Sequence, residues 1–128
     1  MRVMSVIVVL LGLASLVLGV LFITQAASAE QEVADTIAPL TLAELDAKYD
    51  AVKAKADAVR ATEEPQIQAG QAMPSAMYNY LSVQRTSLGL CRTNIGTASF
   101  VRTTGIINII LGLGLVLAGM ALLRKASS

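Results

Sequence analysis

The sequence predicts an all-α membrane protein in which two antiparallel transmembrane helices are joined by a long extracytoplasmic helical hairpin that is coiled-coil-like. Three observations lead to this fold class. Two uncharged blocks, residues 3–29 and 105–123, each match the roughly 20 apolar residues that cross a bilayer. The segment between them is mostly polar and carries all nine acidic side chains. Within it, apolar residues recur at alternating spacings of three and four, which predicts two helices packed along a seam.

The first block, residues 1–29, is predicted to be a transmembrane helix that the mature protein keeps. Its apolar run from Val6 to Ile23 is longer than the about 7–15 residues typical of a signal peptide. The block nevertheless ends in Ala27-Ser28-Ala29, which has the small-x-small form of a signal-peptidase site. Cleavage after Ala29 therefore stays open as the alternative.

Small residues recur every seven positions in both apolar blocks, and they favour retention of the first. Such residues let two helix backbones approach closely, which is a main source of packing energy in lipid. In antiparallel helices, the numbers of paired positions have a constant sum, and three pairs satisfy this condition. They are Ser5 with Gly119, Gly12 with Gly112, and Gly19 with Gly105. Asn108, an amide about one turn inside the second block, is a further predicted packing residue.

Residues 30–103 are predicted to form the helical hairpin. Thr41-Leu42-Ala43-Glu44 is a capping box, which predicts a helix start, and Pro39 marks a break before it. The tip is predicted near residues 63–74, because Glu63-Glu64-Pro65 has turn chemistry and Gly and Pro residues follow it. The predicted seam of the two arms consists of Leu42, Leu45, Tyr49, Val52, Val59, Met77, Leu81, Leu88, Cys91 and Ile95.

The second block, residues 104–124, is predicted to be the other transmembrane helix, followed by a cytoplasmic tail at 125–128. Arg2 precedes the first block and Arg124-Lys125 follow the second, so the positive-inside rule places both termini in the cytoplasm. We therefore expect a multi-pass protein of the plasma or inner membrane with residues 30–103 outside the cytoplasm.

Side chains that support catalysis or metal binding are scarce. The sequence has no His and a single Cys, which excludes metal sites built from Cys and His. Cys91 is interpreted as a buried thiol, with a disulfide to the Cys91 of a second copy as the alternative. Arg85 and Arg92 are candidate contacts for a small anion, although a salt-bridge face explains them as well. We predict no enzymatic activity, catalytic residue, cofactor or metal, and no nucleic-acid partner.

Three functional hypotheses follow. The first is a structural, accessory or scaffolding protein whose partners, besides membrane lipid, are a second copy in a four-helix bundle or a larger membrane complex. The second is an extracytoplasmic sensor that signals through a partner, since the layout of residues 1–123 resembles the front half of bacterial chemoreceptors and sensor kinases; those proteins continue into a cytoplasmic signalling domain. The third is a secreted hairpin cleaved after Ala29 and anchored by its C-terminal helix.

Overall fold

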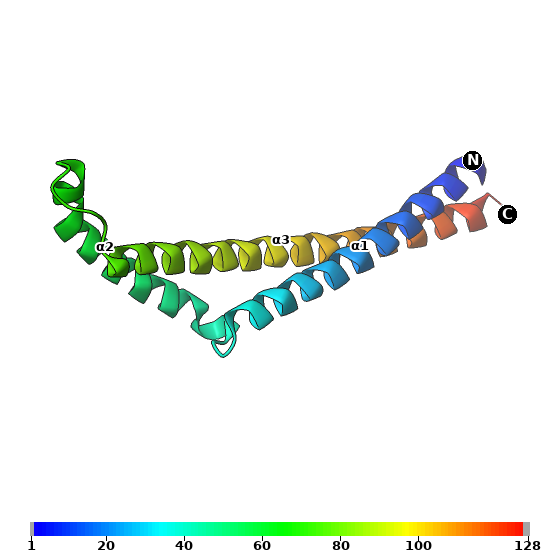
Figure 1. Ribbon diagram of the computed structural model, residues 1–128. Coiled ribbons are helices and arrows are strands. Elements are labelled where there is room, and N and C mark those ends of the chain that lie inside the picture. Colours follow the sequence, from blue (N-terminus) through cyan, green and yellow to red (C-terminus); the bar gives the residue numbers. More distant parts are fainter. Residues whose placement is uncertain (1, 127–128) are drawn as a thin grey trace. The chain divides into compact units, whose positions relative to one another are not determined.

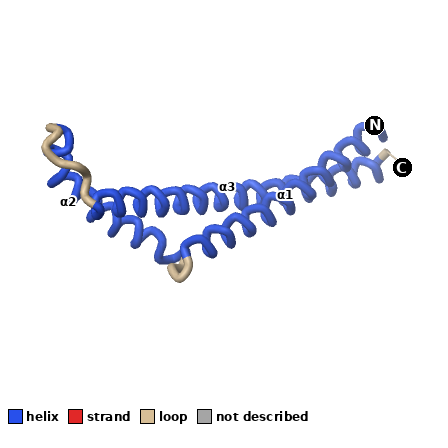
Figure 2. The backbone as a smooth tube through the Cα atoms, in the orientation of Figure 1, coloured by secondary structure: helices blue, strands red, loops and turns tan. Residues whose placement is uncertain are grey.

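The computed structural model describes residues 2–126, and the prediction of an all-helical chain is confirmed for them. The helices are α1 (Arg2–Ile37), α2 (Leu45–Gln68) and α3 (Ala76–Lys125), labelled in Figure 1. A short 3₁₀ turn, η1 (Leu42–Glu44), precedes α2. Short loops connect these helices, and residues 2–126 contain no strand (Figure 2).

Two of the helices, α1 with 36 residues and α3 with 50, are long and apolar enough to cross a membrane. Neither contains a proline, so no main-chain hydrogen bond of the helix interior is lost. The glycines inside them cost up to about 1 kcal/mol each in helix propensity. This cost is offset by close packing at the buried glycines, which are Gly12, Gly19, Gly105, Gly112 and Gly119. Gly96 and Gly114 are exposed and have no such contact.

Proline and glycine mark the two breaks between helices. α1 ends at Ile37, two residues before Pro39, which has no N–H to donate and restricts the residue before it. α2 ends at Gln68, and Gly70 adopts a left-handed φ of 69° that a residue with a Cβ rarely takes. The Gly70 N–H donates to the carbonyl of Ile67 at 3.0 Å, which closes the end of α2.

Pro65 lies inside α2, although its neighbourhood was predicted to begin a turn. α2 continues to Gln68, and the connection to α3 comprises residues 69–75. Pro65 opens the last four residues of α2, where its missing N–H removes a single helix bond. Just before it, the carboxylates of Glu63 and Glu64 accept hydrogen bonds from the hydroxyls of Ser75 and Tyr78 near the start of α3.

The described chain divides into two compact units. The apolar unit consists of residues 2–30 and 97–126, which belong to α1 and α3. The polar unit consists of residues 31–96, which include the end of α1, all of α2 and the beginning of α3.

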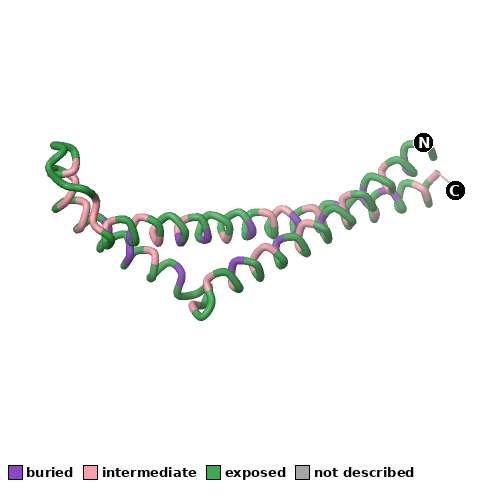
Figure 3. Tube along the Cα trace, viewed as in Figure 1, coloured by how far each residue is buried: buried purple, intermediate pink, exposed green. Residues whose placement is uncertain are grey.

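Buried positions of the apolar unit recur every seven residues along both helices, and Figure 3 shows how sparse they are. A spacing of seven keeps residues on one face of a helix. The buried positions are all small: Ser5, Gly12, Gly19 and Ala26 in α1, and Ala98, Gly105, Gly112 and Gly119 in α3. The larger aliphatic side chains consequently point away from this face.

The core of the polar unit is built from three helical segments, whereas the sequence predicted a seam between two. Val33, from the last turns of α1, is buried together with residues of α2 and α3, and Ile37 and Leu40 pack against the same cluster. The third segment arises because α1 does not stop at the end of its apolar block but continues to Ile37. Its apolar residues thereby cover part of the seam that two helices alone would leave open.

Candidate functional site

The first candidate functional surface is the small-residue stripe of the apolar unit, which consists of the buried small residues of α1 and α3 named above. A Cβ atom added to Gly12 would lie 2.8 Å from the carbonyl oxygen of Gly112, and one added to Gly19 would lie 2.7 Å from that of Gly105. Real Cβ atoms essentially never come so close to another atom. At these positions, main chain therefore packs directly against main chain.

The pairing runs in opposite directions along the two helices. A Cβ added to Gly119 would lie 3.1 Å from the carbonyl oxygen of Ser5, so residue numbers rise along α1 as they fall along α3. The Ser15 hydroxyl also donates to the main-chain carbonyl of Asn108 at 2.8 Å. The sequence singled out the side-chain amide of Asn108, whereas the bond with Ser15 uses its main chain.

The outward surface of the apolar unit consists of exposed aliphatic side chains. Leu10 and Val17 of α1 are 59% and 60% exposed, and Ile110 and Leu117 of α3 are 64% and 63% exposed. In each apolar stretch only 11% of the residues are buried. A contiguous apolar surface of this kind marks a site of interaction with a membrane or with another protein.

Charged side chains of the apolar unit bond across its two helices near their ends. The guanidinium group of Arg102 pairs with the carboxylate of Glu30. The Nε of Arg2 donates to the carbonyl oxygen of Ala126 at 3.3 Å. Between these contacts the two apolar blocks carry no charge.

The polar unit brings most of the predicted seam residues together. Leu42 and Met77 lie outside its core and are 37% and 56% exposed, since Leu42 belongs to η1 and Met77 to the first turn of α3. The others are either buried in the core or packed against it. The buried ones are Leu45, Val52, Leu81, Leu88 and Cys91, and the partly buried ones are Tyr49, Val59 and Ile95.

The described residues were expected to lack a metal site built from His and Cys, and the structure bears on this point only through its acidic side chains and Cys91. No set of three or more His, Cys, Asp or Glu side chains in this part of the chain could hold a metal ion. The thiol of Cys91 is free and lies within the buried core of the polar unit. No protein-family model, curated protein or solved structure matches the chain.

Ion pairs join α2 and α3 along one side of the polar unit. Arg85 Nη1 lies 2.7 Å from Asp57 Oδ1, and Arg92 Nε lies 2.7 Å from Asp46 Oδ1. The Arg92 guanidinium also lies 5.2 Å from the ring centroid of Tyr49. Both predicted anion contacts are thus paired with carboxylates of the chain itself. Each exposed ion pair contributes only about 0–1 kcal/mol to the stability of the fold. Their main effect is to favour the alignment of α2 and α3 in which Asp57 lies beside Arg85 and Asp46 beside Arg92.

Glu63 caps the start of α3, a contact that the sequence did not reveal. Its carboxylate accepts the N–H of Ser75 at 3.0 Å and the Ser75 hydroxyl at 2.6 Å. The Ser75 Oγ in turn accepts the N–H of Tyr78 at 3.1 Å, as an N-cap residue does. A serine before an apolar helix is a local signal for a cap, but no local pattern connects it to a carboxylate on the preceding helix.

Glu44 makes a similar contact at the start of α2. Its carboxylate accepts the N–H of Thr41 at 3.0 Å and the Thr41 hydroxyl at 2.6 Å, as the reach-back half of a capping box does. Hydrogen bonds from Thr41, the hydroxyl first, lower the pKa of Glu44 below its usual value of 4.5. The bonds from the hydroxyl and N–H of Ser75 likewise lower the pKa of Glu63.

Acidification is expected to loosen the start of α3. Because the pKa of Glu63 is lower in the folded state, its contribution to stability is present above about pH 4.5 and is lost as the pH falls through the folded pKa. Replacing Glu63 with Gln should have the same effect at neutral pH, because an amide forms weaker bonds than a carboxylate. Hydrogen exchange of the amides of residues 76–80 would measure both effects. Asp50→Asn, which removes a carboxylate elsewhere on α2, is the matched control; equal loss of protection in both variants would contradict this role of Glu63.

Proposed function

We propose that this protein spans a membrane twice and has a structural, accessory or scaffolding role. In this proposal the apolar unit crosses the bilayer as two antiparallel helices, and the polar unit is an extracytoplasmic helical hairpin that the end of α1 braces. The supporting observation is the distribution of side-chain size in the apolar unit: small residues are buried between the helices and large aliphatic residues point outward. Helices in lipid associate in this way, because lipid supplies no hydrophobic driving force and close main-chain packing takes its place.

The length of the uncharged segments fits a bilayer. Residues 3–29 extend over about 40 Å at 1.5 Å per residue, and the hydrocarbon core of a bilayer is about 30 Å thick. In water, each exposed square ångström of apolar surface would cost about 25 cal/mol relative to burial. Lipid contact removes this cost over the outward surface of both helices.

The basic residues support one orientation. Arg2, Arg124 and Lys125 flank the uncharged segments at the chain termini, and cytoplasmic flanks are enriched in such residues. The other flanks carry Glu30 and Arg102, which pair with each other. The proposal therefore places both termini in the cytoplasm and the polar unit on the other side.

Contact between the main chains of Gly12 and Gly112 supports retention of the first block. Cleavage after Ala29 would remove every residue of α1 that lies against this stripe of α3. The exposed glycine stripe of α3 would then have no matching surface in the chain. We therefore propose that the first block stays in the membrane as part of the mature protein.

A role in association, rather than in catalysis, is supported by the surface of the polar unit. Its core covers one face of α3, and Tyr80, Val83 and Leu90 on another face are 60–70% exposed. Large apolar side chains that gather on a surface mark an interaction site. A small helical protein with such a face is suited to hold a partner subunit near the membrane.

Cysteine labelling in intact cells tests this topology. In a Cys91→Ala background, a cysteine at Asp50 should react with an impermeant maleimide from outside, and one at Ala126 should react only after permeabilisation. A cysteine at Leu111 should resist labelling until detergent is added. The intact mass of the purified chain should include the first block. Labelling of Ala126→Cys from outside, or a mass that begins at Glu30, would contradict the proposal.

A further inference from the structure

Three shallow grooves lie on the polar unit, and they share lining residues. The first, of about 650 Å³, and the second, of about 540 Å³, are both lined by Lys48 and Tyr80. The third, of about 430 Å³, shares Val83 and Ser87 with the first. The grooves therefore form one continuous surface on α2 and α3; its first groove also reaches the end of α1, and its third lies on α3 alone. This surface, named the lysine face below, is represented by Lys48, Lys55, Tyr80, Val83, Ser87 and Leu90.

The floor of the lysine face is an apolar stripe along α3. Tyr80, Val83 and Leu90 are 60%, 70% and 61% exposed, and Met77 at the end of the stripe is 56% exposed. Their spacing of three, three and seven residues keeps them on one side of the helix. An apolar stripe of this length accepts the apolar side of another helix, in the manner of helix-in-groove recognition.

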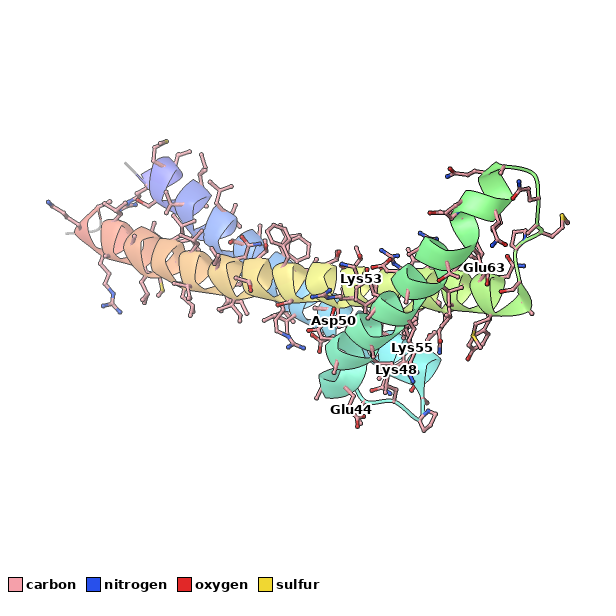
Figure 4. The ribbon with its side chains drawn as sticks, turned by 90° about the vertical axis from the view of Figure 1, so that its left-hand side faces the viewer. Glu44, Lys48, Asp50, Lys53, Lys55 and Glu63 are labelled. Atoms are coloured by element: carbon pink, nitrogen blue, oxygen red, sulfur yellow. The ribbon has the colours of Figure 1, made fainter. Side chains whose placement is uncertain are left out.

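The charged groups of the lysine face are predominantly cationic. Lys48 and Lys55 line it from α2, two helical turns apart. Glu44 is the one carboxylate among the described residues that line the three grooves, and it is bonded to Thr41. Figure 4 shows Lys53 and Asp50 on the other side of α2. Both lysines are exposed, so their ammonium groups can face carboxylates of a partner.

We propose that the lysine face binds a helix of a different polypeptide, one whose apolar stripe is flanked by two carboxylates about two turns apart. The apolar side chains of that helix would cover Tyr80, Val83 and Leu90, and its carboxylates would lie opposite Lys48 and Lys55. This inference rests on the proposed accessory role and specifies the partner that the role requires.

Charge argues against a second copy of this chain on the lysine face. Two copies that met through this face around a two-fold axis would bring four lysines into one interface. The lysine face could instead contact the side of α2 that carries Asp46 and Asp57 in another copy. Such a contact joins two different surfaces, and it produces an open polymer unless the copies close into a ring. On that side, Asp46 and Asp57 are already paired with Arg92 and Arg85.

Photo-crosslinking in the protein's own membranes tests the inference. A benzophenone amino acid replaces Val83 in the full chain, and the crosslinked peptide is identified by mass spectrometry. We expect a peptide from another polypeptide with the stated pattern of apolar and acidic residues. Lys48→Glu and Lys55→Glu should each lower the crosslinking yield about fivefold, because an attraction becomes a repulsion. Lys53→Glu, an equal change on the other side of α2, should leave the yield unchanged.

The remaining outcomes overturn the inference. A crosslink to another copy of this chain would assign the face to self-association, and a crosslink to lipid alone would assign it to the membrane surface. A foreign peptide whose yield does not respond to Lys48→Glu or Lys55→Glu would show that charge does not select the partner. A charge swap tests the pairing directly: changing the partner's carboxylate opposite Lys48 to Lys should restore the yield with Lys48→Glu, and a yield that stays low would contradict the pairing. The cysteine labelling described above reports separately on the proposed topology, so the two proposals can fail independently.

Discussion

Replacing Gly112 with Ala is expected to separate the two helices of the apolar unit. The added Cβ would lie 2.7 Å from the carbonyl oxygen of Gly12 and 2.9 Å from the main-chain nitrogen of Leu16, so main chain rather than a flexible side chain has to move. Overpacking of this kind typically costs about 1–3 kcal/mol. We expect the free energy of separating the helices to fall by about this amount.

Pulsed electron paramagnetic resonance can follow this separation in mild detergent. Spin labels on cysteines at Thr24 and Phe100, both exposed positions of the apolar unit, report the distance between α1 and α3 during titration with a denaturing detergent. Gly114→Ala is the matched control, because a Cβ at Gly114 meets nothing within 4 Å. If the two variants separate at the same detergent concentration, the close contact at Gly112 does not stabilise the pair.

Truncating Leu81 to Ala is expected to destabilise the polar unit by about 2–5 kcal/mol, the range for removing a buried leucine side chain. Leu81 is 5% exposed and contacts the cluster to which α1, α2 and α3 all contribute. Leu90, on the same helix, is 61% exposed, and Leu90→Ala in the isolated protein should change stability by less than about 0.5 kcal/mol.

Hydrogen exchange of the amides of α2 measures this effect without requiring the apolar unit to unfold. The protection of α2 depends on packing against the core, so local opening reports the stability of the polar unit. Faster exchange throughout α2 in Leu81→Ala, with Leu90→Ala unchanged, is the expected result. Similar exchange in the two variants would mean that the cluster around Leu81 contributes little to holding α2 in place.

Together, the glycine stripe and the leucine core indicate that the two units are stabilised in different ways. The apolar unit relies on close approach of main chains, and its large side chains remain outside. The polar unit buries leucine and valine side chains, as proteins in water do. This difference accounts for the change from a leucine-rich to a glycine-rich heptad pattern along α3, where Leu81 and Leu88 are followed by Gly105 and Gly112.

The sequence alone determined the helical elements and the faces on which they carry small or apolar residues. The 3.6-residue period and the hydrogen bonds within a helix are local, so spacing, proline and glycine predict them. The paired numbering of Gly12 with Gly112 and Gly19 with Gly105 also followed from spacing, because two straight antiparallel helices in contact have a constant register.

Only the tertiary structure decided how the segments of the polar unit combine. The contribution of Val33 to the core, the cap that Glu63 provides for Ser75 and the lysine face along Tyr80 and Val83 all join residues from different helices. Such contacts depend on how far α1 continues, on the loop around Pro39 and on the packing of whole side chains, which no local pattern specifies. For this reason the sequence predicted a broad tip at residues 63–74, whereas α2 continues through Pro65 to Gln68 and the connection comprises residues 69–75.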